Sequence, residues 1–453
     1  MLGKTNDTGA GNVRKSVQMV ALAGLVVLTA CDQREPILPG ERLGIRSLTE
    51  AEETSAAAAG DQIIRPVKLP ATVVNSDWAQ GPGSPRYRTD HPALGSDLKL
   101  AWSTSIGRGD GRRTRITASP VVAEGRIYTL DGGATVMATS TAGEPLWSRD
   151  LTPERDGEKD ADGGGLAFDG GRIYVSSGFG HLTALQASSG EVLWTQKLRA
   201  TGTGTPTVYD GVVYLVAGDT TAWAIEADTG RVRWQIDGLA DANNISGGAA
   251  PALTDQRAVF AFGTGELQAT FRQGGLRIWT SALVGQRAGS ALGTIDDVTG
   301  DPMFVGDRVY AANGSGRTAA MSLGGGDQIW AAPHGAMGPL WVAGNSVFQV
   351  SDESRLMRLD ADTGAVIWSR DLPVFEKPNR VRSRSSRFAH HGPVLAGGRL
   401  ILASSDGLIR AFDPADGAPL GAIDLPHGST SAPVVAGQTL YVVSTRGVLH
   451  AFR

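Results

Sequence analysis

The sequence predicts an all-β protein, an eight-bladed β-propeller whose blades are four-stranded antiparallel sheets. A Gly-x-x-x-Trp pattern recurs at intervals of roughly 40–50 residues, the length of one propeller blade. Each copy contains short runs of β-branched and aromatic residues separated by glycine-rich turns, a composition typical of strands. The chain holds 61 glycines and no long helical pattern, which favours many tight turns over helices.

The stretch 170–194 shows the repeated unit most clearly. Its strands are predicted at Ile173–Ser176, His181–Leu185 and Val192–Trp194, with glycine-containing turns between them. The pattern recurs at Gly143–Trp147, Gly190–Trp194, Gly230–Trp234, Gly275–Trp279, Gly326–Trp330 and Gly364–Trp368. In the next copy we expect Leu420 to stand in place of the tryptophan. A ring at one place in every repeat indicates packing between blades, whereas a stacked flat cofactor would need a single site.

The two ends of the repeat region complement each other. The last copy starts near Thr430 and stops at Arg453, before its final turn and its tryptophan strand. An isolated tryptophan strand around Trp102 has no inner strands before it. Joining the two gives an eighth, composite blade that closes the ring through N- and C-terminal strands and removes an open sheet edge.

The N-terminus resembles an export signal with a lipid-attachment site. Residues 1–30 carry Arg14 and Lys15, then a short apolar run, and end before Cys31, the only cysteine of the chain. The Leu-Thr-Ala-Cys sequence there is similar to a bacterial lipobox, so Cys31 is the predicted acylation site and membrane anchor. A plain secretory signal with a chance cysteine is the alternative. A single cysteine also excludes an intrachain disulfide.

Three further segments follow from composition. Residues 31–75 are predicted to be the lipidated terminus and a flexible linker, because 50–60 is acidic and then alanine-rich, with no apolar stripe. Residues 76–97 are turn-rich, with aromatic residues, and are expected to pack on the propeller without forming a blade. The propeller itself is predicted to span 98–453.

The chemistry-bearing residues form no recognisable catalytic, metal or cofactor site. A net charge of −4 gives no basic field for nucleic acid. Seven histidines are scattered without metal-binding spacing, and neither a Gly-x-Ser-x-Gly elbow nor a P-loop is present. Glu158, Asp160 and Asp162 are spaced as in a calcium loop, but a solvated loop between blades is the favoured interpretation.

Two arginine-rich stretches are candidates for binding an anionic partner or lipid headgroups, with a solvated connector as the simpler alternative. The first stretch contains Arg112, Arg113 and Arg115, and the second contains Arg380, Arg382, Arg384 and Arg387.

The repeat itself resembles that of quinoprotein-type propellers, through Ala-Asp-Thr-Gly-x-x-x-Trp at 227–234 and 361–368. With the lipobox, the Cys-Asp-Gln-Arg-Glu-Pro sequence from Cys31, and the stretches 163–175, 265–269 and 295–310, the chain is similar to the BamB family. That family comprises lipoprotein subunits of the β-barrel assembly machinery, and the resemblance covers 31–453.

This resemblance implies a non-catalytic, monomeric periplasmic scaffold that aids folding and insertion of outer-membrane β-barrel proteins. The implied partners are the POTRA domains of BamA and other barrel-assembly subunits, with unfolded outer-membrane proteins as further candidates. Of the family's two partner-binding segments, Ile245 and Gly247 match the first, and Asp297 matches the second; Asn243, Ser246 and Thr299 depart from the pattern. The implied location is the periplasmic face of the outer membrane, although Asp32 leaves inner-membrane retention open.

Two alternatives remain at this point. Quinone-dependent dehydrogenases share the repeat, but in that family the cofactor lies under a vicinal cysteine pair beside calcium, and this chain has only Cys31. The third interpretation is a periplasmic propeller that binds a small ligand or peptidoglycan without an assembly role.

Overall fold

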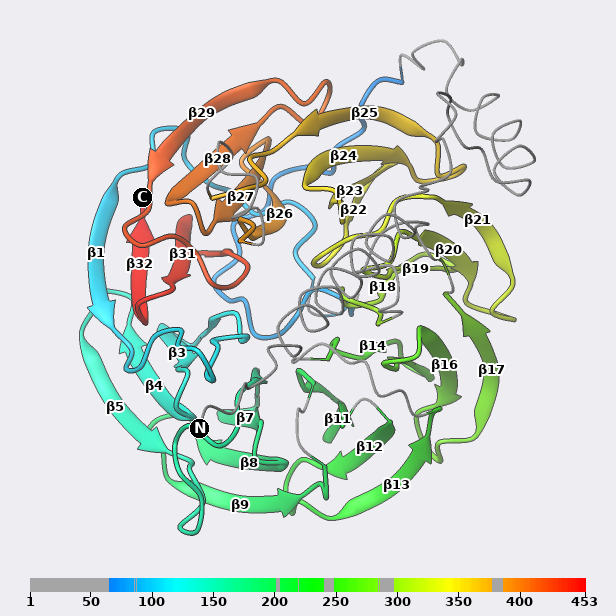
Figure 1. Ribbon diagram of the computed structural model, residues 1–453. Coiled ribbons are helices and arrows are strands. Elements are labelled where there is room, and N and C mark those ends of the chain that lie inside the picture. Colours follow the sequence, from blue (N-terminus) through cyan, green and yellow to red (C-terminus); the bar gives the residue numbers. More distant parts are fainter. Residues whose placement is uncertain are drawn as a thin grey trace, which may run out of the picture. The chain divides into compact units, whose positions relative to one another are not determined.

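The computed structural model describes residues 65–453 except Pro85, Tyr87, 201–203, Asp219, 240–247, Val284, 286–296 and 377–385. Over these residues the chain forms strands and turns and no helix. The described strands build eight four-stranded antiparallel sheets that follow one another around a ring (Figure 1). The predicted all-β, eight-bladed propeller is therefore confirmed. A helix suited to crossing a bilayer is not found within the described ranges.

Seven blades are continuous in the chain and are numbered in chain order. Within each blade the strands are given from the innermost to the outermost. Blades 1 to 4 are β2–β5 (Val121–Ala123, Arg126–Leu130, Thr135–Ser140, Pro145–Asp150), β6–β9 (Gly164–Asp169, Arg172–Ser177, His181–Gln186, Val192–Lys197), β10–β13 (Thr207–Tyr209, Val212–Ala217, Thr221–Glu226, Val232–Asp237) and β14–β17 (Ala252–Leu253, Arg257–Ala261, Glu266–Phe271, Arg277–Ala282). Blades 5 to 7 are β18–β21 (Met303–Val305, Arg308–Ala312, Thr318–Ser322, Gln328–Ala332), β22–β25 (Trp341–Ala343, Ser346–Val350, Arg355–Asp360, Val366–Asp371) and β26–β29 (His390–Ala396, Arg399–Ser404, Leu408–Phe412, Pro419–Asp424).

Blade 8 combines both ends of the ring. Its three inner strands are the last of the chain, β30 (Val434–Ala436), β31 (Thr439–Ser444) and β32 (Val448–Phe452), and its outer strand is β1 (Leu100–Ser105). β1 pairs antiparallel with β32, with Thr104 opposite Leu449 (Figure 1). The predicted closure by N- and C-terminal strands is therefore confirmed.

The middle strands of a blade are buried on both faces because each blade packs between two others. All six residues of β11 are buried, as expected for a continuous apolar run of strand length. Outer strands such as β13 instead alternate between exposed and half-buried residues, because one edge and part of one face meet solvent.

The recurrent tryptophans lock each blade to the next one. On every such outer strand the indole Nε1 donates to a backbone carbonyl in the outer turn of the following blade, as Trp194 does to Ala227 at 3.0 Å. The six other pairs are Trp102–Thr141, Trp147–Ala187, Trp234–Arg272, Trp279–Leu323, Trp330–Ala361 and Trp368–Pro414. The expected packing role of these rings is thus confirmed.

The glycine of the repeat receives the ring of the preceding blade. Gly230 has a φ of +72°, and a Cβ placed on it would lie 2.7 Å from the Trp194 ring. Both the left-handed backbone and the close ring approach therefore require glycine. Each Gly-x-x-x-Trp segment therefore takes part in two contacts between blades. Its glycine packs against the tryptophan ring of the preceding blade, and its own tryptophan packs against the following blade.

Only blade 7 lacks the ring among the eight described outer strands, and the expected substitution there is wrong. In the strand ladder Gly421 pairs with Ala411 at the place where Trp368 pairs with Arg358. Leu420 is instead 53 % exposed, one residue before the tryptophan position. The physical reason lies in blade 8, where β32 ends near Arg453 and β1 begins at Leu100, so no outer turn exists to receive a ring.

A strap formed by residues 75–92 runs around the inner strands of the ring. Its contacts follow the blades in order from blade 8 through blade 1 to blade 7. They are Asn75–Val435, Trp78–Val122, Ala79–Phe168, Gln80–Val208, Ser84–Leu253, Gly83–Phe304, Asp90–Trp341 and Pro92–Gly397. The strap thereby supplies a hydrogen-bond partner to every blade.

Candidate functional site

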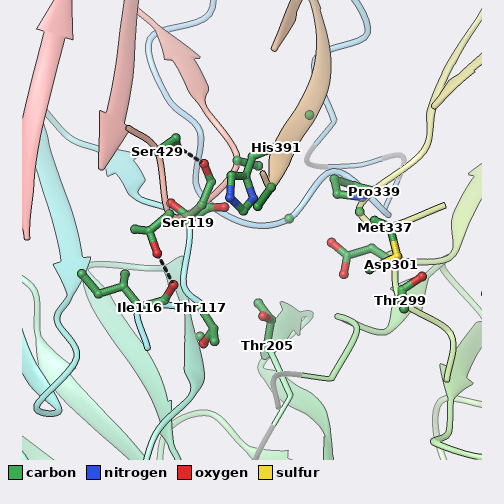
Figure 2. Close-up of a pocket in the computed structure, with 18 of the residues that line it drawn as sticks. Ile116, Thr117, Ser119, Thr205, Thr299, Asp301, Met337, Pro339, His391 and Ser429 are labelled. Carbon is green, nitrogen blue, oxygen red and sulfur yellow. Dashed lines mark hydrogen bonds between the residues drawn. The ribbon is translucent and has the colours of Figure 1, made fainter. Parts of the chain in front are cut away.

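A funnel of about 850 Å³ opens at the centre of one face of the ring (Figure 2). Its walls come mainly from the segments that enter the innermost strands, because the chain returns there from the outside of the preceding blade. The turns between second and third strands add residues such as Phe262, Ser405 and Thr445. Both kinds of loop lie on the same face, which is where propeller loops can be varied without disturbing the ring.

The strap forms the floor of the funnel. Trp78, Gln80, Gly81 and Pro82 all line the cavity. Trp78 stacks on Trp341 of blade 6 with ring centroids 6.1 Å apart. Gln80 is 2 % exposed. Its side-chain amide accepts from Val208 N at 2.7 Å and donates to Val208 O at 3.1 Å, so the floor is fixed by a paired polar contact.

Asp110 organises the wall where blades 8 and 1 meet. Its carboxylate accepts from Ile116 N at 2.9 Å and from Thr430 Oγ1 at 2.9 Å. Arg115 lies 3.6 Å from the same carboxylate. Asp110 therefore ties the loop between β1 and β2 to the loop before β30.

Asp301 is the most perturbed acid of the funnel, and Figure 2 shows its carboxylate directed into the cavity. One oxygen accepts from Ala250 N at 2.7 Å. Burial raises the pKa of Asp301 to about 6, and the bond from Ala250 opposes this only in part. A Cβ on Gly81 would lie 2.9 Å from the other carboxylate oxygen, so a larger residue in the strap would have to displace that carboxylate.

Two histidines of β26 belong to the wall at blade 7. His390 is held by Ser404 Oγ at Nδ1 and by the Pro373 carbonyl at Nε2, at 2.7 and 2.8 Å. His391 points into the funnel in Figure 2, and burial, with a smaller effect from His390, lowers its pKa to about 4. It is therefore neutral at neutral pH. Within the described part of the chain, no three His, Cys, Asp or Glu side chains are grouped as metal ligands.

The residues predicted to bind a partner are only partly visible. Asp297 lines the funnel and is 6 % exposed, directly before the segment that leads to β18. Ile245 and Gly247 lie outside the described residues, as do the predicted lipidation site Cys31 and its neighbour Asp32. The structure therefore leaves their roles as predictions.

The other charged candidates fall into two groups. Arg387 is described and its guanidinium lies 5.6 Å from the Phe375 ring centroid, whereas Arg380, Arg382 and Arg384 lie outside the described residues. In the calcium-like stretch, Glu158 pairs with Arg108, and Asp160 accepts from Gly157 N at 2.7 Å.

Sequence reasoning missed Asp301 and the path of the strap. A single aspartate before a Pro-Met-Phe strand carries no motif. The sequence of the strap contains two aromatic residues and several turn residues. These residues do not recur at a regular spacing, so the contacts of the strap could not be predicted from them.

Comparisons with known proteins agree with this architecture. The family model described as "Outer membrane protein assembly factor BamB" matches residues 132–370 and 377–453. The outer membrane protein assembly factor BamB of Shewanella oneidensis is 28 % identical over 362 residues, which cover 78 % of this chain and 88 % of the relative.

Two solved structures share the fold. BamB from Moraxella catarrhalis superposes with a TM-score of 0.63 at 17 % identity, covering 79 % of this chain and all of that one (100 %). Quinohemoprotein alcohol dehydrogenase from Comamonas testosteroni gives a TM-score of 0.64 at 17 % identity, with 89 % and 84 % covered. At this identity the likeness concerns the propeller fold alone.

Proposed function

The chain belongs to the family of outer membrane protein assembly factor BamB, and from this membership we propose that it is a non-catalytic scaffold of the β-barrel assembly machinery. In this role it aids the folding and insertion of outer-membrane β-barrel proteins from the periplasmic face of the outer membrane. The observation that carries the proposal is the family match, which extends over most of the ring.

The fold supports a scaffold role. Seven tryptophan locks and the strap hold the blades together, so loops on the funnel face project from a rigid ring. Ile245 and Gly247 precede β14 in the sequence and Asp297 precedes β18, and these are the innermost strands of neighbouring blades. On this order we assign the three residues to the surface that binds the BamA POTRA domains.

The composition of the chain argues against the dehydrogenase alternative. The fold is shared with a quinohemoprotein dehydrogenase, yet only Cys31 is available where that family uses a vicinal cysteine pair.

Co-purification tests the function. Tagged full-length protein, solubilised from membranes in detergent, is expected to capture the central barrel subunit, identified by mass spectrometry. The Ile245→Ser/Asp297→Ala variant should capture less of it, while Leu276→Ser, which removes a 70 % exposed leucine at an outer turn of blade 4, should not. Recovery of no barrel-assembly subunit with the wild type would overturn the proposal.

Anchoring is tested separately. Since Cys31 is the only acylation candidate in the sequence, Cys31→Ser should leave the precursor unprocessed or release the protein from the membrane fraction. Unchanged outer-membrane fractionation of this variant would contradict lipid anchoring. Fractionation of the wild type decides whether Asp32 retains it in the inner membrane.

A further inference from the structure

The structure brings separate arginines together on the half of the funnel face formed by blades 7, 8 and 1. Arg112, Arg113 and Arg115 lie in the loop between β1 and β2, and all three are exposed. Arg446, in the turn between β31 and β32, packs its backbone against Gly109 of that loop. Arg387 lines the funnel with Arg115, from the loop before β26. We call Arg112, Arg113, Arg115, Arg387 and Arg446 the arginine arc.

The positive charge of the arc is largely uncompensated. Arg115 is 61 % exposed and shares Asp110, whose carboxylate is already bound by Ile116 and Thr430. No described carboxylate forms an ion pair with the other four arginines of the arc. Two acids also lie near the arc: Glu376 is exposed beside Arg387, and Glu158 pairs with Arg108 of the loop between β1 and β2. Unpaired arginines around one opening attract anions and accelerate their association.

The funnel wall beneath the arc is polar and hydrogen-bonding. Ser429, Thr430 and Thr445 line it together with Arg115 and Arg387. Each hydroxyl donates to a group of the protein itself, which leaves its oxygen to accept from a bound segment. Two arginines of the arc, Arg115 and Arg387, therefore line a concave opening with hydroxyl groups inside it. A polypeptide segment can enter such an opening, whereas a planar bilayer reaches only its rim.

The described N-terminal end of the chain lies on the face of the ring opposite the arc. The described chain begins at Arg65, which pairs with Asp360 and Asp362 at the outer turn of blade 6. Lys68 N donates to Asn345 Oδ1 in the turn between β22 and β23. Outer turns and these inner turns lie on the face opposite the funnel, so the described chain meets the ring on that face.

From these observations we propose that the arginine arc is a docking surface for an acidic polypeptide segment of a partner protein. The segment lies across the mouth of the funnel, with carboxylates on the arginines and backbone groups near the hydroxyl-lined wall. This surface lies on blades 7, 8 and 1, whereas Asp297, assigned above to the barrel subunit, lines the same funnel just before blade 5. The arc contains none of the residues assigned to that subunit, so the two assignments can be tested with separate variants.

Fluorescence anisotropy of a labelled peptide of alternating glutamate and serine tests the proposal with the full-length protein in detergent. Wild-type protein should bind it, with affinity that falls steeply as salt rises, because exposed charges are screened within about 8 Å at physiological ionic strength. The Arg112→Gln/Arg113→Gln/Arg446→Gln variant should bind about tenfold more weakly, since several modest exposed charge contacts add.

The matched control removes three positive charges from the outer wall. Lys99→Gln/Arg231→Gln/Arg277→Gln alters exposed residues away from the funnel and should bind the peptide like the wild type. Equal weakening by both triple variants would show a general charge effect and overturn the proposal, as would equal binding by the arc variant and wild type. Thermal midpoints of all three proteins confirm that they are folded.

A competition arm distinguishes a lipid from a peptide. Dihexanoyl-phosphatidylglycerol, inorganic phosphate and dihexanoyl-phosphatidylcholine are added to the peptide complex. If phosphatidylglycerol displaces the peptide at a much lower concentration than inorganic phosphate does, the arc is a lipid-headgroup site and the proposal is overturned. Similar weak displacement by both anions supports it. Capture of the barrel subunit by the arc variant is expected to stay at wild-type level, which separates this test from that of the proposed function.

Discussion

Trp194→Ala tests how much one tryptophan lock contributes to the stability of the ring. The half-buried indole packs at 6.0 Å from the Tyr174 ring of its own blade and covers Gly230 of the next one. It also donates to Ala227 O at 3.0 Å. Because the ring is only half-buried, we expect a loss of roughly 2–4 kcal/mol, the lower part of the range for aromatic truncation. Differential scanning calorimetry should show the midpoint falling by several degrees.

Two variants separate packing from hydrogen bonding. Trp194→Phe keeps most of the ring, and Tyr174 OH still donates to Ala227 O at 3.3 Å, so no carbonyl is left without a partner and the loss should be about 1 kcal/mol. Leu193→Ala, one residue earlier and 42 % exposed, should change the midpoint little. A Trp194→Ala midpoint equal to that of Leu193→Ala would refute the lock.

Three further predictions follow from the funnel, the strap and the closure. Because burial raises the Asp301 pKa from 3.8 to about 6, the folded state favours the protonated acid, and its ionisation above that pH costs up to about 3 kcal/mol. Asp301→Asn, which keeps an acceptor for Ala250 N, should therefore stabilise the protein at pH 7.5 and lose that advantage as pH falls to 4, in paired melting curves at both pH values. Gln80→Ala leaves buried Val208 N without its acceptor and should cost about 2–3 kcal/mol, whereas Lys68→Ala on the same N-terminal segment should be neutral by melting. Deletion of 446–453 removes β32 and should abolish the soluble monomer in size-exclusion chromatography; an unchanged elution and melting curve would contradict closure by β1 and β32.

The ring could be predicted because its determinants repeat. Nearly every copy has a glycine that forms a left-handed turn and a tryptophan that packs against the next blade. The pattern can therefore be recognised in the sequence without any knowledge of contacts. Closure followed from the same count, since an incomplete last copy and the orphan strand at Trp102 fit together. Periodic features of this kind are the part of a fold that a single sequence reveals best.

The funnel could not be predicted to the same extent. Its floor depends on Gln80 meeting Val208, and on Gly81 passing Asp301, contacts between residues 128 and 220 positions apart in an aperiodic segment. The pKa of Asp301 depends on the desolvation that this meeting creates, and nothing in the residues around it signals the burial. The arginine arc is similar, because Arg446 meets the loop that carries Arg113, at Gly109, only through ring closure.

The one missing tryptophan shows how topology can override a repeat. A ring at Gly421 would have no turn to cover, because the chain is interrupted between β32 and β1, and a Cβ there would meet nothing within 4 Å. The seam between blades 7 and 8 therefore depends on face-to-face packing. A single apolar cluster spans it, with Leu400 and Leu402 of β27, Leu440 and Val442 of β31, and Phe452 of β32 all fully buried or nearly so. Trp78 and Leu94, from the strap and just beyond it, join the same cluster. The segment that precedes the ring thus reinforces the seam that the ring's own repeat leaves without a lock.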